Sequence, residues 1–305
     1  MVVPPPSLLL PDHPVGDAVR RMARDLVHRH GDTVTAILFH GSCLRDEGGR
    51  GILDLYVLVD DYRAFHRHPV TALANAVLPP SVGFVADVGG AFQGAKVTVI
   101  SRDQFAARVT ADSLDTTVWA RFCQPVALVH CRNAGVADWV AQTLSQAAAT
   151  AVHWAVHLGP AEGRAEDFWT TLFRQTYDVE LRVEGPSRAG QLYGFAPARF
   201  DATFAALAPA EVDRLPDGQY RVHLAESRRR QARARWRRRR IAGKILNVVR
   251  LTKALFTFDG GVDYIVGKLE RHSGQRVALE PWQRRHPLLA APGLLWSLYR
   301  RGVIR

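Results

Sequence analysis

The chain has 305 residues, enough for two domains of ordinary size, and 47% of them are hydrophobic and 23% charged. This composition is typical of a folded globular protein and excludes an intrinsically disordered one. The net charge is +11, and nine arginines of the segment Arg228–Arg240 account for most of it, so any anionic partner concerns that segment first. Three cysteines without paired or metal-type spacing favour a reducing compartment.

The first 133 residues show a mixed α/β pattern. Hydrophobic periodicity and end signals predict helices over residues 17–30, 60–77 with a break at Pro69, 102–109 and 113–122. Apolar runs predict strands over residues 33–39, 52–59, 82–88, 96–100 and 125–130. This alternation predicts an α/β domain over residues 1–133, with a mixed sheet and flanking helices.

The pattern beyond residue 133 is mostly helical. Helices are predicted over residues 136–157, 166–183, 197–207 and 228–256. In the last of these, an apolar stripe that includes Ile241, Ile245 and Val248 follows an arginine-rich first half. We therefore predict a mostly α-helical second domain over residues 134–285, followed by a basic amphipathic tail over residues 286–305.

The most informative motif is a Gly-Ser turn followed by a strand that carries an aspartate. Gly41-Ser42 ends the strand predicted at residues 33–39, and after eleven further residues Asp54 lies near the start of the next apolar strand. Glycine lets backbone N–H groups come close to a triphosphate, and a strand carboxylate can hold Mg²⁺. The motif therefore indicates transfer of a nucleoside monophosphate from a nucleoside triphosphate, with loss of pyrophosphate.

This spacing resembles the polymerase-β-like nucleotidyltransferase superfamily, in which a Gly-Ser turn precedes a strand of the form Asp-apolar-acid. One element differs, because Tyr56 stands where the second acid is usual. The difference matters for the metal site, since only Asp54 of the usual carboxylate pair remains.

Further segments resemble one branch of that superfamily, the mitochondrial-type CTP:phosphatidate cytidylyltransferases of the translocator assembly and maintenance family, which also lack the second acid. The matching segments, in the same order over residues 33–270, are His40 to Ser42, Asp54 to Tyr56, Phe65-His66, Lys96 to Ser101, Ala120 to Val126, Thr176 to Arg182, Gly243 to Ile245 and Tyr264 to Leu269. The departures from the family pattern are Phe65 for Trp, Ala120 for Gly, Gln124 for Lys and Glu180 for Asp.

The resemblance implies CTP and phosphatidate as substrates, Mg²⁺ as cofactor, and CDP-diacylglycerol and pyrophosphate as products. In that reaction Gly41 and Ser42 would cradle the nucleotide phosphates, Asp54 would hold the metal, and Lys96 and Arg121 would contact phosphate oxygens. The other nucleotide-binding candidates are His66, Tyr177, Glu180 and Arg182.

A second metal ligand must come from another strand. Asp60 shares a face with Asp54, but six residues of extended chain separate the two by about 20 Å. Asp87 ends a separate predicted strand that can lie beside the first. We therefore predict Asp54 and Asp87 as the metal ligands.

Two basic segments suit an anionic membrane surface: Arg228–Arg240, and residues 286–305, where leucines, Trp296 and Tyr299 lie between arginines. Nucleic acid is less favoured, because Trp236 is the only aromatic residue in the arginine run and single-strand binding usually uses several stacking platforms. The N-terminal residues resemble neither a signal nor a transit peptide, and no apolar run is long enough for a membrane span. We expect a cytoplasmic protein that is peripheral at the inner face of the membrane.

Two alternatives stay open at this point. The first is a nucleotidyltransferase that acts on RNA, a protein or a small molecule. The second is a catalytically inactive binding protein on a nucleotidyltransferase fold, which the missing second acid would suit.

Overall fold

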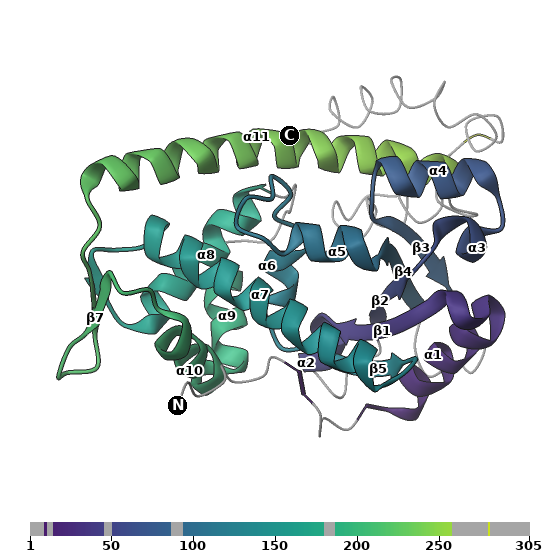
Figure 1. The fold of residues 1–305 in the computed structure, drawn as a ribbon, viewed down its shortest axis with the longest axis horizontal. Helices are drawn as coiled ribbons and strands as arrows, with labels where there is room; N and C mark the ends of the chain where they lie inside the picture. The colour runs from purple at the N-terminus through teal and green to yellow at the C-terminus, as the bar shows by residue number, and fades with distance from the viewer. Residues whose placement is uncertain are drawn as a thin grey trace.

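The computed structural model describes residues 9–10, 15–45, 51–86, 94–179, 187–257 and 280. Its central element is a five-stranded sheet with the strand order β3-β4-β2-β1-β5 (Figure 1). The strands are β1 (Val34–His40), β2 (Ile52–Val59), β3 (Ser81–Val85), β4 (Gly94–Ser101) and β5 (Ala127–Cys131). The pair β2–β4 is parallel and the other pairs are antiparallel, so the predicted mixed sheet is confirmed.

Helices cover both faces of this sheet. One face packs against α1 (Asp17–His30), α3 (Tyr62–His66) and α4 (Pro69–Val77). The other face packs against α5 (Arg102–Arg108), α6 (Trp119–Phe122) and α7 (Ala134–Leu158). Every residue of β1 is buried, because the strand lies between β2 and β5 in the sheet and between two helical layers.

Local signals placed several boundaries correctly. Helix α1 has the predicted bounds, and the predicted break at Pro69 separates α3 from α4. Asp61 caps α3, since its carboxylate accepts a hydrogen bond from the Ala64 N–H at 2.7 Å. Proline is tolerated in the first turn of α4 because that N–H would have no partner in the helix.

The helix predicted over residues 113–122 is wrong for its first half, since only α6 forms there. The Asp115 carboxylate accepts hydrogen bonds from the Thr117 N–H at 3.1 Å and the Thr117 hydroxyl at 2.6 Å. The Ser113 hydroxyl donates to the Asp115 carbonyl at 2.9 Å. These local bonds satisfy the backbone in a non-helical conformation, as short polar side chains often do.

The second half of the chain is mostly helical, as predicted. It contains α8 (Ala165–Val179), α9 (Ser187–Phe195), α10 (Pro197–Leu207) and α11 (Glu226–Thr257). The sequence did not predict α9, nor a small sheet of β6 (Glu162–Gly163), β8 (Tyr220–Val222) and β7 (Val212–Arg214). One continuous cluster of buried side chains joins these helices to a face of the large sheet. The domain boundaries at residues 133 and 285 stay predictions, and the tail over residues 286–305 lies outside the described residues.

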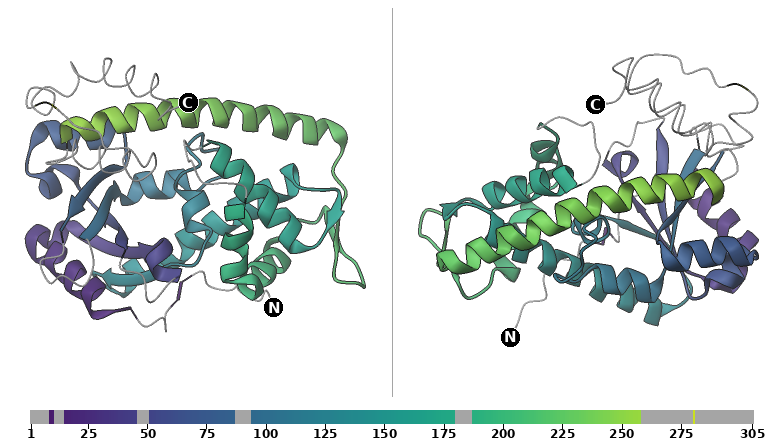
Figure 2. Two further views of the ribbon diagram at one scale, coloured as in Figure 1. Left: turned by 180° about the vertical axis from the view of Figure 1, so that it is seen from behind. Right: turned by 90° about the horizontal axis from the view of Figure 1, so that it is seen from above.

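Helix α11 confirms the single long helix predicted over residues 228–256, and it lies along both the helical region and the sheet (Figures 1 and 2). Trp236 and Arg239 face inward from it and are buried. The Arg239 guanidinium lies 4.3 Å from the centre of the Trp154 ring and donates to the Ser113 carbonyl at 3.0 Å. Within the described residues, no helix is both long and apolar enough to cross a membrane.

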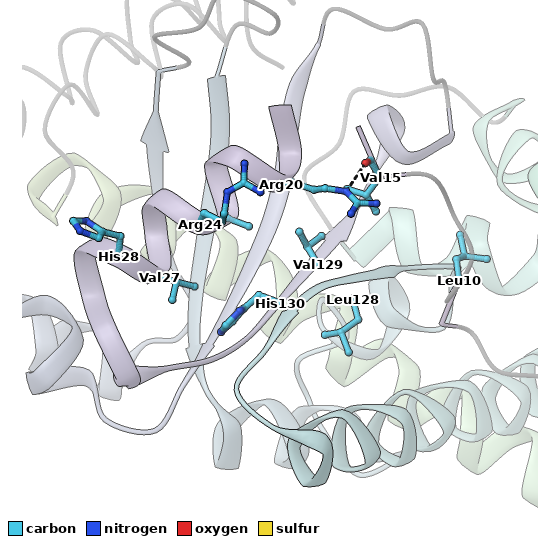
Figure 3. Close-up of a pocket in the computed structure, with 10 residues that line it drawn as sticks. Leu10, Val15, Arg20, Arg24, Val27, His28, Leu128, Val129 and His130 are labelled. Atoms are coloured by element: carbon cyan, nitrogen blue, oxygen red, sulfur yellow. Dashed lines mark hydrogen bonds between the residues drawn. The ribbon is translucent and has the colours of Figure 1, made fainter. Parts of the chain in front are cut away.

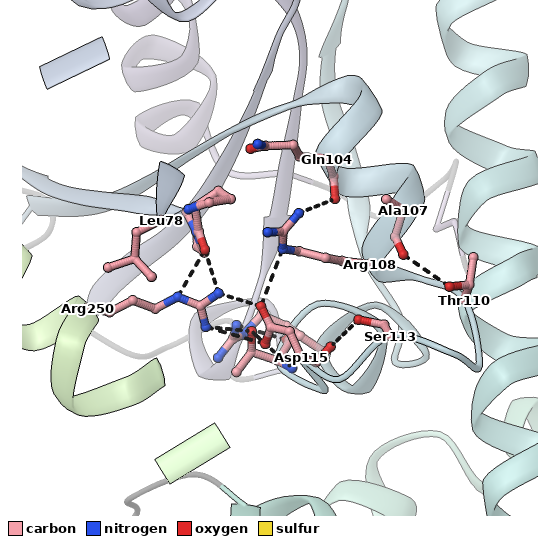
Figure 4. A network of polar contacts seen from close by, with 12 residues as sticks. Leu78, Gln104, Ala107, Arg108, Thr110, Ser113, Asp115 and Arg250 are labelled. Carbon is pink, nitrogen blue, oxygen red and sulfur yellow. Dashed lines mark hydrogen bonds and ion pairs between the residues drawn. The ribbon is translucent and has the colours of Figure 1, made fainter. Parts of the chain in front are cut away.

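The C-terminal half of α11 is bound to the sheet region by a buried polar network (Figure 4). Arg250 forms an ion pair with Asp115 and donates to the Pro79 carbonyl at 3.0 Å, and Arg108 approaches the same carboxylate at 3.4 Å. Burial alone would raise the pKa of Asp115, but the hydrogen bond and charge of Arg250 outweigh it and hold that pKa below its ordinary value.

Replacement of Asp115 by asparagine should lower the free energy of unfolding by about 3 kcal/mol, because two partly buried guanidinium groups would lose their buried charged partner. The lowered pKa means that the carboxylate stabilises the fold above its ordinary pKa of 3.8 and that this stabilisation disappears as the pH falls through the folded-state value. Denaturant unfolding at neutral and acid pH measures both effects. Asp25→Asn, at an exposed position of α1, is the control and should change stability little; an equally small effect of Asp115→Asn would contradict the assignment.

Candidate active site

Three side chains form a row across neighbouring strands where the sheet reaches solvent. His40 at the end of β1 is the register partner of Asp54 on β2, and Asp54 is the register partner of Lys96 on β4. The Lys96 ammonium lies 3.4 Å from Asp54 Oδ1. The Asp54 and Lys96 side chains are 26% and 29% exposed, so a ligand can reach both.

Gly41 places its backbone directly against the Asp54 carboxylate. Its φ of +93° lies in the region that favours glycine, and a Cβ at this position would come within 2.4 Å of Asp54 Oδ2. Ser42 follows it, is exposed, and begins the short helix α2 (Ser42–Arg45). The glycine is therefore required by the close approach of the turn to the carboxylate.

Neighbouring charges keep Asp54 ionised, and burial keeps His40 neutral. Burial raises the pKa of Asp54, but the charges of Lys96 and Arg121 more than offset it and bring the pKa below its ordinary value. Burial lowers the pKa of His40 to about 3, so its ring carries no charge near neutral pH. The site thus offers one carboxylate beside fixed cations.

Arg121 comes to this group from α6. Its guanidinium donates to the Thr117 carbonyl at 3.2 Å, and its charge acts on both Asp54 and His40. The fold therefore assembles the predicted residues Gly41, Asp54, Lys96 and Arg121, with Ser42 next to the turn. His40 was not predicted as a neighbour of the carboxylate, although its position directly before Gly41 on the antiparallel partner strand is the signal that places it there.

Tyr56 does not replace the absent second acid. Its side chain is fully buried, and its ring centre lies 4.8 Å from that of Phe122 and 6.0 Å from that of Phe105. Burial raises the pKa of Tyr56 to about 12, so its hydroxyl stays protonated. The position that holds a second carboxylate in the two-acid pattern is part of the hydrophobic core in this chain.

His66 lies away from the row. It is on α3, which follows the far end of β2, and five strand residues from Asp54 to Val59 already span about 17 Å. Its ring bonds the side-chain amide of Asn75 at 3.0 Å, and burial lowers its pKa to about 4. The structure gives His66 a partner between α3 and α4 and does not bring it to Asp54.

The remaining candidates lie elsewhere or outside the described part. Tyr177 is half-buried near the end of α8, close to where Val179 meets Gly243 of α11. Asp87, Glu180 and Arg182 lie outside the described residues, so their predicted roles stay predictions.

The described residues contain no cluster of three or more side chains that could hold a metal ion by themselves. The donor set at Asp54 nevertheless suits Mg²⁺, which is usually bound by one or two carboxylates together with substrate phosphates and water. The ionised and partly exposed Asp54 carboxylate fits that role.

A pocket of about 570 Å³ lies elsewhere, between α1 and β5 (Figure 3). Arg20, Arg24 and His28 line it from α1, and Leu128 and His130 line it from β5. Because α1 covers the sheet face opposite to that of Tyr56 and Asp54, this pocket is separate from the row.

Comparison with known proteins identifies no family for this chain. No protein-family model matches the sequence, and neither does any curated protein. One similar solved structure is a nucleotidyltransferase-like protein from Exiguobacterium sibiricum 255-15, with 10% identity, a TM-score of 0.28, and coverage of 94% of this chain and 93% of that one. Values this low establish neither a common fold nor a common activity.

Gly41→Ala should disturb the turn and the carboxylate together, because the new methyl group would meet Asp54 in a backbone conformation that alanine rarely adopts. We expect a loss of about 1–3 kcal/mol in the free energy of unfolding, together with weaker binding of nucleoside triphosphate in calorimetry. Gly194→Ala, in α9 with open space around it, is the matched control. Unchanged stability and binding in Gly41→Ala would show that the turn tolerates a side chain.

Proposed function

We propose that the protein transfers a nucleoside monophosphate from a nucleoside triphosphate to an acceptor. The observation that carries this proposal is the row itself: a single ionised carboxylate, Asp54, lies against a glycine turn with Lys96 at 3.4 Å and Arg121 nearby. A triphosphate needs close backbone approach and neutralisation of crowded negative charge, and this arrangement provides for both.

For the substrates we propose CTP and phosphatidate, with CDP-diacylglycerol and pyrophosphate as products. Support for this finer assignment comes from the order of short sequence segments that resemble the mitochondrial-type cytidylyltransferases. The absence of a second acid beside Asp54 agrees with that branch, since Tyr56 is built into the core.

The chemistry needs alignment more than proton transfer. A phosphate monoester such as phosphatidate has a second pKa near 6, so it is already a nucleophile at neutral pH. Lys96 and Arg121 would hold phosphate oxygens and offset their charge, and Gly41 would let the backbone approach the triphosphate. Burial lowers the pKa of His40 to about 3, so its ring is a weak proton acceptor at neutral pH, and this chemistry requires no general base.

Mg²⁺ is the proposed cofactor, with Asp54 as its protein ligand and Asp87 as the proposed second one. When bound, the ion would supply charge neutralisation and alignment of the triphosphate. Lys96 then changes partner in our proposal, from the carboxylate to a phosphate oxygen.

The first alternative, transfer to RNA, a protein or a small molecule, uses the same row and differs only in the acceptor. The second, an inactive binding protein, predicts nucleotide binding without release of pyrophosphate. Labelled product analysis separates all three, because the label enters lipid, enters another acceptor, or stays in the nucleotide.

Purified protein, Mg²⁺, phosphatidate in mixed micelles and each α-labelled nucleoside triphosphate should give labelled lipid with CTP only. Asp54→Asn should reduce turnover roughly 1,000-fold or more while the protein still folds, because an amide binds Mg²⁺ poorly. Asp60→Asn is the matched control at the other end of β2, where Asp60 pairs with Arg132 at 2.6 Å. Label in RNA or protein, and none in lipid, would refute the phosphatidate assignment.

Lys96→Gln should lower kcat by about 100-fold, as loss of one charged contact to the reacting phosphates does. It should also raise the pKa of Asp54, since the ammonium is the charge that lowers this pKa most. NMR titration of the carboxylate in the free protein checks the second effect independently of activity. A normal kcat with a shifted pKa would mean that Lys96 serves Asp54 only and does not touch substrate.

A further inference from the structure

The outer face of α11 changes character halfway along the helix. Its first half exposes arginines, among them Arg230, Arg237 and Arg238. Its second half exposes a row of apolar side chains at helical spacing, with exposed fractions of 62%, 58%, 53% and 45% for Ile241, Ile245, Val248 and Val249. The sequence alone shows an apolar stripe here, and the structure shows that the stripe points to solvent.

A second apolar row lies on the neighbouring helix. Val70, Leu73 and Val77 of α4 are 65%, 65% and 75% exposed. Helix α4 lies beside the C-terminal half of α11 (Figures 1 and 2), where Lys253 reaches the Pro80 carbonyl at 3.0 Å just beyond the end of α4. Two adjacent helices therefore both expose rows of large apolar side chains, and rows of this kind mark interaction sites more often than singly scattered apolar residues do.

The charged side chains of α11 are also almost all positive. Residues 226–257 contain twelve lysines and arginines and a single acid, Glu226. An apolar groove on another protein would cover the apolar half of α11 but would not use the positive charge of its arginine-rich half. A nucleic acid would bind the arginines but offers little to exposed isoleucine and valine. A bilayer with anionic headgroups uses both halves, as interfacial helices do.

We propose that the outer faces of α11 and α4 form a docking surface for anionic phospholipid bilayers. The apolar side chains of both helices would enter the boundary between headgroups and acyl chains, and the arginines of α11 would lie among the headgroups. The proposal rests on the proposed function in one respect, since a lipid acceptor explains why such a surface would be needed. It differs from the sequence-based expectation in giving the apolar contact to α11 and α4.

The test is co-sedimentation of the full-length protein, without nucleotide, with vesicles of phosphatidylcholine that contain or lack phosphatidylglycerol. The anionic vesicles should bind the protein. The double variant Ile245→Gln/Val248→Gln should bind at least about tenfold more weakly, because two exposed apolar side chains would no longer enter the bilayer. Arg237→Glu/Arg238→Glu should lose roughly 25-fold or more. Both should keep the melting temperature and the sedimentation coefficient of the parent protein.

A charge-matched control is Arg21→Glu/Arg24→Glu, two exposed arginines of α1, and it should bind vesicles nearly as the parent does. Equal loss in this control would mean non-specific attraction and would overturn the proposal. Unchanged vesicle binding of the glutamine variant would also overturn the proposal. If that variant also had a lower melting temperature, another part of the chain would cover the apolar row of α11. If it had a changed sedimentation coefficient, a second copy of the chain would cover that row. Phosphatidylglycerol is not the proposed acceptor, so these vesicles test the surface alone. A protein that binds them but transfers no CMP to phosphatidate in the micelle assay would refute the function and leave the surface standing.

Discussion

The burial of β1 and β2 on both faces is the constraint from which the site follows. Helices pack against both sides of these central strands, and a charge in mid-strand would be buried without water. Charged side chains that must reach a ligand can therefore lie only where these strands reach solvent. His40, Asp54 and Lys96 occupy that end on three adjacent strands. Tyr56 is on the same face as Asp54 but two residues further along the strand, where the face is already part of the core.

Much of the fold could be predicted from local pattern, because long apolar runs and clear end signals set α1, β2 and α11. The predictions failed where a few polar contacts decide the structure. Asp115 and Thr117 bond each other and prevent a helix, and the strands β6, β7 and β8 have too few residues to show any periodicity. For the candidate site, the motif named Asp54 and Gly41, but the place of Lys96 depends on parallel register with β2, which no local pattern records.

The arginine run shows how one segment can serve the interior and the surface together. From composition alone, the segment Arg228–Arg240 is expected to be a solvated basic helix face. In the structure, Arg239 lies against the Trp154 ring and bonds loop carbonyls, while Arg237 and Arg238 stay exposed. The planar guanidinium suits the buried position, since it stacks on an aromatic ring and donates several hydrogen bonds at once. The positive charge of the segment is therefore shared between structural and external roles.

The attachment of α11 also bears on how the chain can fold as it is made. Arg250 and Lys253 meet Asp115 and Ser81, partners that lie 135 and 172 residues earlier in the sequence. A ribosome synthesises the chain from the N-terminus, so the sheet can form while the Asp115 carboxylate still has no Arg250. Contacts of such long range are also slow to close. The Asp115 carboxylate and its neighbouring apolar surface therefore stay exposed on the nascent sheet region until α11 is released. During that interval the chain depends most on a chaperone.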